Sequence, residues 1–120
     1  MSEQKWYKKT YRWCQTNLTE IDAKVCDIEF WKKYWKDNKI QGIIVNAGGI
    51  VAYYPSKYPL QYRSKYLGDG DLVKVFTNAA RENGIRVLAR MDINRATAEF
   101  VEAYPKWFTR DKDGVPYRAG

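Results

Sequence analysis

The 120 residues are 45% hydrophobic and 29% charged, a composition typical of one small globular domain and not of a disordered chain. The sequence contains no histidine, which excludes within this chain the Ser-His-Asp and Cys-His catalytic systems and the commonest zinc sites. The formal net charge of +7 suits a polyanionic partner, but the lysines and arginines form no block of like charge, so nucleic acid is only an alternative partner.

The amino-terminal part of the chain predicts one strand between polar segments. Residues 1–10 are polar and basic and predict a lead-in segment or a short helix. Residues 11–16 predict the first strand, which ends in Thr16 and Asn17, and residues 17–25 predict a loop.

The first clear helix is predicted to begin after Asp27 and to end near Asn38. Its apolar residues recur at the spacing that places them on one face: Ile28, Phe30, Trp31, Tyr34 and Trp35. An aromatic stripe of this kind is more typical of a core than of a cofactor site, so we expect it to pack against the sheet.

The second strand is predicted over residues 43–45 and is followed by Asn46, Gly48 and Gly49. The paired glycines allow a positive φ or a close approach of the backbone, but their spacing is not that of a dinucleotide or P-loop motif. Asn46 either hydrogen-bonds a ligand or caps the following loop.

Residues 55–70 predict a long irregular loop rich in tyrosine and lysine, and loops of this length are usually functional or mobile. A second clear helix is predicted to start after the N-cap Asp71 and to stop at Gly84. Its apolar residues share one face: Leu72, Val75, Phe76, Ala79 and Ala80.

The third strand begins at residues 85–89, a mostly apolar run that predicts burial on both faces, as in a parallel sheet covered by helices. Arg90, Asp92 and Asn94 follow at alternate positions and point to one side if the extended conformation continues. Polar groups at this end of a strand lie where α/β proteins place their ligand sites. The alternative is that Arg90 and Asp92 only pair with each other.

Residues 96–104 predict a short helix ended by Pro105, and residues 109–114 predict a turn. The alternation of strand and helix predicts an α/β fold with βαβ units and parallel strands. A closed (β/α)8 barrel takes about 250 residues. Residues 1–120 are therefore predicted to be the amino-terminal portion of a single TIM-barrel domain, its first three βα units. A complete flavodoxin-like domain competes, but it needs more strands than the sequence provides.

Several short segments, each present once and spread over most of the chain, carry a resemblance to a known family: residues 15–18, 20–23 and 45–52, Tyr54-Pro55, residues 84–92 and 104–108, Arg110-Asp111 and Asp113-Gly114. From about Tyr11 onward the chain resembles the family called hypothetical glycosyl hydrolase 6. The resemblance implies a TIM barrel distantly similar to α-amylase- and fucosidase-like glycosidases. It also implies a hydrolase of carbohydrate metabolism that cleaves O-glycosyl bonds.

The resemblance implies that seven residues at strand ends face the barrel mouth and bind substrate: Thr16, Asn17, Asn46, Gly48, Gly49, Arg90 and Asp92. Tyr54 and Trp107 are expected to stack on a sugar ring, or else to serve packing. Asp92 is expected to be catalytic or to orient a sugar hydroxyl. Glycoside hydrolysis needs a pair of carboxyl groups, and related barrels usually supply them from later strands.

The leading expectation is the amino-terminal part of a glycoside hydrolase, which acts on a carbohydrate and is inactive as an isolated segment. A non-catalytic saccharide-binding module and a nucleic-acid-binding module are the alternatives. Because a sheet of three strands has two unpaired edges, we also expect the isolated chain to associate with itself.

Cys14 and Cys26 match no metal-ligand spacing and are expected to be buried or idle thiols, so we expect neither a metal nor a cofactor. No apolar run reaches membrane-spanning length, and the first residues do not lead into a signal-peptide core. A cytoplasmic location with no membrane partner is therefore expected.

Overall fold

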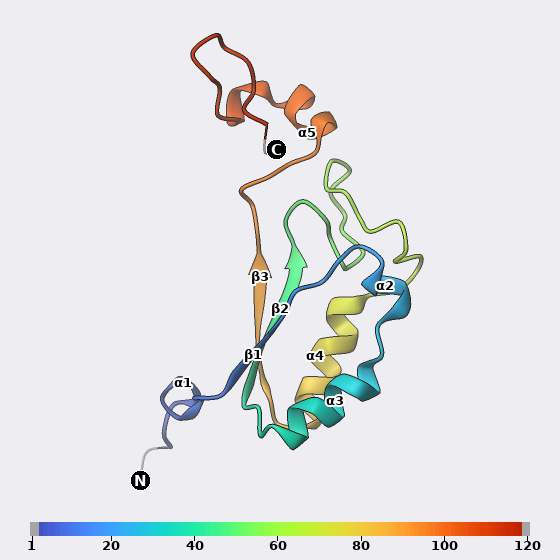
Figure 1. Cartoon of the computed structure of the whole chain (residues 1–120), viewed down its shortest axis with the longest axis vertical. Coiled ribbons are helices and arrows are strands. Elements are labelled where there is room, and N and C mark those ends of the chain that lie inside the picture. The colour runs from blue at the N-terminus through green and yellow to red at the C-terminus, as the bar shows by residue number, and fades with distance from the viewer. Residues whose placement is uncertain (1–2, 119–120) are drawn as a thin grey trace.

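The computed structural model of the chain describes residues 3–118 and contains one parallel three-stranded sheet (Figure 1). The elements in chain order are α1 (Trp6–Lys9), β1 (Trp13–Thr16), α2 (Asp22–Val25), α3 (Ile28–Asp37), β2 (Gly42–Gly48), α4 (Leu72–Glu82), β3 (Arg86–Met91), α5 (Ala98–Ala103) and a 3-10 helix, η1 (Pro105–Trp107). The strand order β1-β2-β3 confirms the predicted mixed α/β fold with parallel strands.

The two long helices begin and end where the local chemistry predicts. The Asp27 side chain accepts a hydrogen bond from the Phe30 amide at the start of α3, and Asp71 caps Lys74 in the same way at the start of α4. The chain leaves α4 through Gly84, whose φ of 68° is the left-handed conformation that glycine adopts at low cost.

Both long helices lie on the same face of the sheet (Figure 1) and enclose the core between themselves and β2. Ile43 and Val45 of β2 point to this face and are buried, as are Trp35 of α3 and Phe76 of α4. The rings of Trp35 and Phe76 lie 6.0 Å apart at a tilt of 50°. Trp35 of the aromatic stripe of α3 therefore lies in the core, as predicted. Phe30, which belongs to the same stripe, remains 57% exposed.

Within residues 3–118, the opposite face of the sheet, here called the open face, has no helix over it except at its amino end, where Trp6 of α1 lies near Trp13 and Arg86 (Figure 1). Val87 packs against the core, but Leu88, which alternates with it along β3, is 44% exposed. The prediction that the third strand is buried on both faces is therefore wrong for residues 3–118.

The amino ends of the strands are closed by the first residue of β1 and by the residues just before it. The Trp13 ring lies across Gly42, where an added Cβ would come within 2.5 Å of it. The Gln41 side chain accepts hydrogen bonds from the amides of Tyr11 and Arg12 and donates to the Lys9 carbonyl. These contacts fix the start of β1 beside β2.

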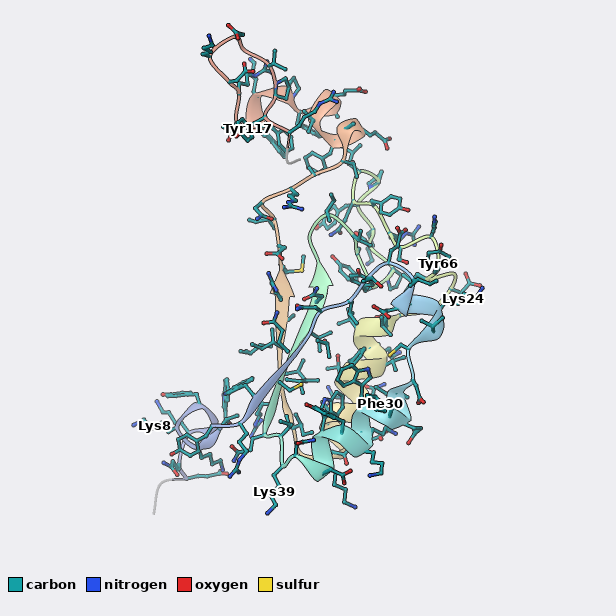
Figure 2. All side chains as sticks on the ribbon, in the orientation of Figure 1. Lys8, Lys24, Phe30, Lys39, Tyr66 and Tyr117 are labelled. Carbon is teal, nitrogen blue, oxygen red and sulfur yellow. The ribbon has the colours of Figure 1, made fainter. Side chains whose placement is uncertain are left out.

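The carboxyl-terminal segment forms a separate lobe beyond the carboxyl ends of the strands (Figure 1). Figure 2 shows Tyr117 on this lobe, at the opposite end of the molecule from Lys8 and Lys39. The centre of the carboxyl-terminal lobe is an aromatic cluster in which Phe100 contacts Tyr104, Trp107 and Phe108. The predicted turn is present, since Asp111 Oδ1 accepts hydrogen bonds from the Asp113 and Val115 amides.

Candidate functional site

The carboxyl ends of β2 and β3 bring three of the predicted site residues together on the open face. Asn46 is paired in register with Arg90 and alternates with the buried Val45, so both side chains point away from the helices. Arg90 Nη2 lies 2.8 Å from Asp92 Oδ2. The site therefore combines an amide, a guanidinium and a carboxylate at adjacent strand ends.

The Arg90–Asp92 pair orients Asp92 more than it stabilises the fold. Its side chains are 41% and 52% exposed, and an exposed pair of this kind contributes at most about 1 kcal/mol. Among residues 3–118, the second carboxylate oxygen of Asp92, Oδ1, accepts no hydrogen bond. That oxygen is free to accept one from a ligand hydroxyl.

Asn46 contributes an acceptor whose hydrogen-bonding capacity is unused. Its Oδ1 is buried and has no hydrogen-bond partner within residues 3–118. An unsatisfied buried acceptor costs about 1–3 kcal/mol, so a hydroxyl or water that donates to it would be favoured.

The two predicted glycines shape the backbone beneath this group. The Gly48 carbonyl accepts a hydrogen bond from the Asp92 amide at 3.2 Å, just past an irregularity in the β2–β3 register. Gly49 has a φ of 133°, and a Cβ added to it would lie 2.3 Å from the Asp92 carbonyl oxygen. Both glycines therefore hold the main chain of Asp92 in place.

The end of β1 contributes less than predicted. Thr16 is only 2% exposed, pairs with the core residue Val45, and donates its hydroxyl to the Ile44 carbonyl at 3.3 Å. It therefore lies on the helix side of the sheet and is not brought to the open face. Asn17 is exposed, and its Oδ1 accepts a hydrogen bond from Gln15 Nε2 at 2.7 Å.

Within residues 3–118, the side-chain hydrogen bond of Tyr54 and the ring contacts of Trp107 are made with residues other than Asn46, Arg90 and Asp92. Tyr54 is half-buried and donates its hydroxyl to Gln61 Oε1 at 3.0 Å. Trp107 is 69% exposed on the carboxyl-terminal lobe and stacks on Tyr104 with ring centroids 4.4 Å apart. Within the described residues, the ring of Trp107 contacts only aromatic rings of that lobe.

The long loop after β2 is held by contacts that the sequence did not reveal. Gln61 Oε1 accepts hydrogen bonds from both Tyr54 and Ser56. Glu20 Oε1 accepts from the Tyr62 hydroxyl at 2.5 Å and from the Lys65 amide at 3.0 Å. The only sequence signal was the tyrosine-rich composition of the loop, which gives no partners.

The electrostatic consequences are local. The hydrogen bond from Tyr62, followed by that from the Lys65 amide, lowers the pKa of Glu20, and the same bond raises the pKa of Tyr62. Burial raises the pKa of both Cys14 and Cys26, which makes their thiols less reactive. Within residues 3–118, no three acidic or cysteine side chains come together as a metal site would require.

Three parallel strands in one sheet, with helices between them along the chain, define an α/β protein, a class in which ligand sites typically lie at the carboxyl ends of the strands. More particularly, the chain belongs to the family hypothetical glycosyl hydrolase 6, which matches residues 27–119. This confirms the family resemblance. The quoted segments before residue 27 lie outside the match.

A solved structure with the same fold is α-L-fucosidase isoenzyme 2 from Paenibacillus thiaminolyticus, with a TM-score of 0.65 and 21% sequence identity. The likeness covers 92% of this chain and 18% of the fucosidase chain, so the present chain spans less than a fifth of its length. Comparison with curated proteins gave no match. In the part of the chain that the structure describes, no helix is both long and apolar enough to cross a membrane.

Proposed function

We propose that this chain is the amino-terminal part of a glycoside hydrolase, with Asn46, Arg90 and Asp92 forming one side of its substrate site. The observation that carries the proposal is the convergence of these three side chains on the open face, where Arg90 is in register with Asn46 and 2.8 Å from Asp92. Family membership supports this reaction class, because the family is described as a hypothetical glycosyl hydrolase family.

The architecture proposed for the whole domain is a (β/α)8 barrel, of which this chain supplies the first three βα units. A sequential strand order with α3 and α4 on one face supports this reading. The Cα radius of gyration is 17.6 Å, whereas a compact domain of this length has one of about 14 Å. An extended shape and an uncovered face suit a segment that packs against further strands better than a complete flavodoxin-like domain.

Asp92 is proposed to grip a sugar hydroxyl through Oδ1 while Arg90 holds Oδ2. Glycoside hydrolysis needs two carboxyl groups about 5–10 Å apart, and one acidic side chain at the described strand ends is not a pair. The acid and nucleophile are therefore proposed to come from later strands, with Asp92 touching substrate beside them.

The test is hydrolysis of aryl glycosides by the complete protein that contains this chain. Because the structural neighbour is an α-L-fucosidase, 4-nitrophenyl α-L-fucoside is the first probe, followed by a panel of other sugars. Replacing Asp92 by Asn should lower kcat/KM about 10- to 100-fold, the effect of losing one charge-assisted hydrogen bond. Asp69→Asn, at an exposed position in the long loop, is the matched control and should leave kcat/KM unchanged.

The outcome separates the two roles of Asp92. A rise in KM with little change in kcat assigns it to substrate binding, whereas a loss of kcat beyond about 1,000-fold assigns it to the chemical step. Absence of turnover across the whole panel would remove the hydrolase assignment.

A saccharide-binding module without catalysis is the second candidate. The stacked Tyr104–Trp107 pair favours it, because Trp107 offers an exposed ring of the kind that sugars stack on. Calorimetric binding of an oligosaccharide that Trp107→Ala abolishes, with no product formed, would favour this function over hydrolysis.

A further inference from the structure

A cavity of about 190 Å³ lies between the end of β2, the long loop and the carboxyl-terminal lobe. It is here called the loop cavity, and its walls include Gly49, Gln61, Ile93, Arg95 and Phe100. This volume is below the roughly 300–1,000 Å³ of sites for drug-sized ligands, so the loop cavity suits one sugar unit or its substituent.

The loop cavity adjoins the open-face site through shared backbone. Gly49 lines the cavity and lies against the Asp92 main chain, and Ile93 of the cavity wall directly follows Asp92. The residue that holds the main chain of Asp92 and the residue that follows it are therefore both part of the cavity wall. This continuity makes the loop cavity a second subsite of the function proposed above, on which the inference rests.

The wall of the cavity is held in a defined conformation. Both Tyr54 and Ser56 donate to Gln61 Oε1, at 3.0 and 2.6 Å, so the amide oxygen of Gln61 is used and its nitrogen is the group left to donate. Tyr62, the next residue along the wall, is anchored by its hydrogen bond to Glu20. A wall anchored in this way needs little reorganisation on binding.

Two side chains of the cavity wall offer hydrogen-bond donors: Gln61 through its amide nitrogen and Arg95 through its positively charged guanidinium. Arg95 has no ion pair or hydrogen bond recorded within residues 3–118, and no acidic side chain is among the residues that line the cavity. The remaining wall is largely apolar, with Ile93 and Phe100 as examples. Donors, a guanidinium and an apolar surface together fit a sugar ring that carries an anionic group.

We propose that the loop cavity is a subsite for an acidic sugar, whose carboxylate or sulfate binds Arg95 and Gln61 while its ring packs on Phe100. The formal net charge of +7 supports the same substrate class, because a basic protein attracts acidic polysaccharides over distance. The subsite extends the Asp92 site from a generic carbohydrate site to one selective for charge.

The test compares matched acidic and neutral ligands by calorimetry on the complete protein. The probes are tetrasaccharides of polygalacturonate, hyaluronan and alginate, each beside its methyl ester, which keeps the sugar rings and removes the charge. A sulfated chondroitin disaccharide is a separate arm that distinguishes sulfate from carboxylate. At least one acid form should bind about tenfold or more tightly than its neutral counterpart, with an affinity that falls as salt is added.

Three variants locate the effect. Arg95→Gln should remove the preference for the acid form, whereas Arg12→Gln, the same change at an exposed residue just before β1, should preserve it. Gln61→Glu keeps an acceptor for Tyr54 and Ser56 but adds a negative charge to the cavity, so it should abolish binding of the acid form and spare the ester.

Equal binding of acids and esters, no binding by any acidic probe, or a preference that survives in Arg95→Gln would overturn the inference. Hydrolysis of neutral aryl glycosides with no binding of acidic probes would leave the proposed hydrolase function standing without this subsite. Binding of an acidic probe without turnover of any glycoside would support the subsite and remove the proposed hydrolase function.

Discussion

Gly49 lies directly against the main chain of Asp92, so close that a Cβ on Gly49 would be 2.3 Å from the Asp92 carbonyl oxygen. Together with the hydrogen bond from the Asp92 amide to the Gly48 carbonyl, this contact fixes the position of the Asp92 backbone just after β3. The glycine at the end of one strand thus positions the acidic residue at the end of the next.

Replacing Gly49 by Ala should destabilise the protein by about 2–6 kcal/mol. Its φ of 133° is unfavourable for an L-residue, and the added methyl clashes with backbone that cannot move freely, at about 1–3 kcal/mol for each effect. Urea denaturation measures the loss. Gly68→Ala is the matched control, because Gly68 has a φ of 56° and no atom within 4 Å of an added Cβ. It should lose only about 1–2 kcal/mol, and equal losses at the two glycines would contradict the close contact.

The helices were predictable because their ends depend on local chemistry. Asp27 and Asp71 cap the first turns of α3 and α4 through hydrogen bonds within three residues, and Gly84 follows the end of α4. The burial of β3 was predicted wrongly because burial depends on which elements pack on each face of the sheet, and the sequence of the strand does not show them. Leu88 has the composition of a buried residue, but the described chain places nothing over it.

The site was predictable in part, for a related reason. Position after an apolar run predicts which residues end a strand, and Asn46, Arg90 and Asp92 are brought together at the sheet edge. Which face of the sheet each side chain of β1 points to is harder to predict, because Trp13 to Thr16 show no clear alternation of apolar and polar residues. In the structure, Thr16 points into the core. The contacts of Gln61 and Glu20 join residues distant in sequence or within an irregular loop, where no periodic pattern exists.

The contact between Glu20 and the long loop should weaken in acid. The pKa of Glu20 is lowered in the folded protein, so the stability that its carboxylate contributes is present above the ordinary value of 4.5 and is lost as the pH falls through the folded pKa. Amide hydrogen exchange of Lys65, which donates to Glu20 Oε1, reports this directly. Its protection factor should be constant near neutrality and should fall as the pH is lowered below 4.5.

Glu20→Gln should remove this pH dependence and leave Lys65 with one protection factor across the same range. Glu102→Gln, at an exposed position of α5, should behave as wild type. Acid-induced exchange at Lys65 that persists in Glu20→Gln would assign the effect to another carboxylate.

The isolated chain should associate with itself through the sheet. Both β1 and β3 have one unpaired edge, and the open face beside β3 exposes Leu88. Sedimentation velocity should show an average mass that rises with protein concentration. Leu88→Lys should weaken association several-fold, because a charge on an exposed sheet face must be desolvated when a second sheet packs or pairs there.

Val75→Lys is the matched control for this substitution, since Val75 is 42% exposed and Leu88 is 44% exposed, but Val75 lies on α4 on the far side of the core. If the sheet mediates association, Val75→Lys should sediment as wild type. If both variants weaken association equally, general charge repulsion and not the sheet is responsible. A wild-type chain that stays monomeric at every concentration would show that three strands and two covering helices suffice, and the barrel proposed for the complete domain would then lose one of its physical reasons.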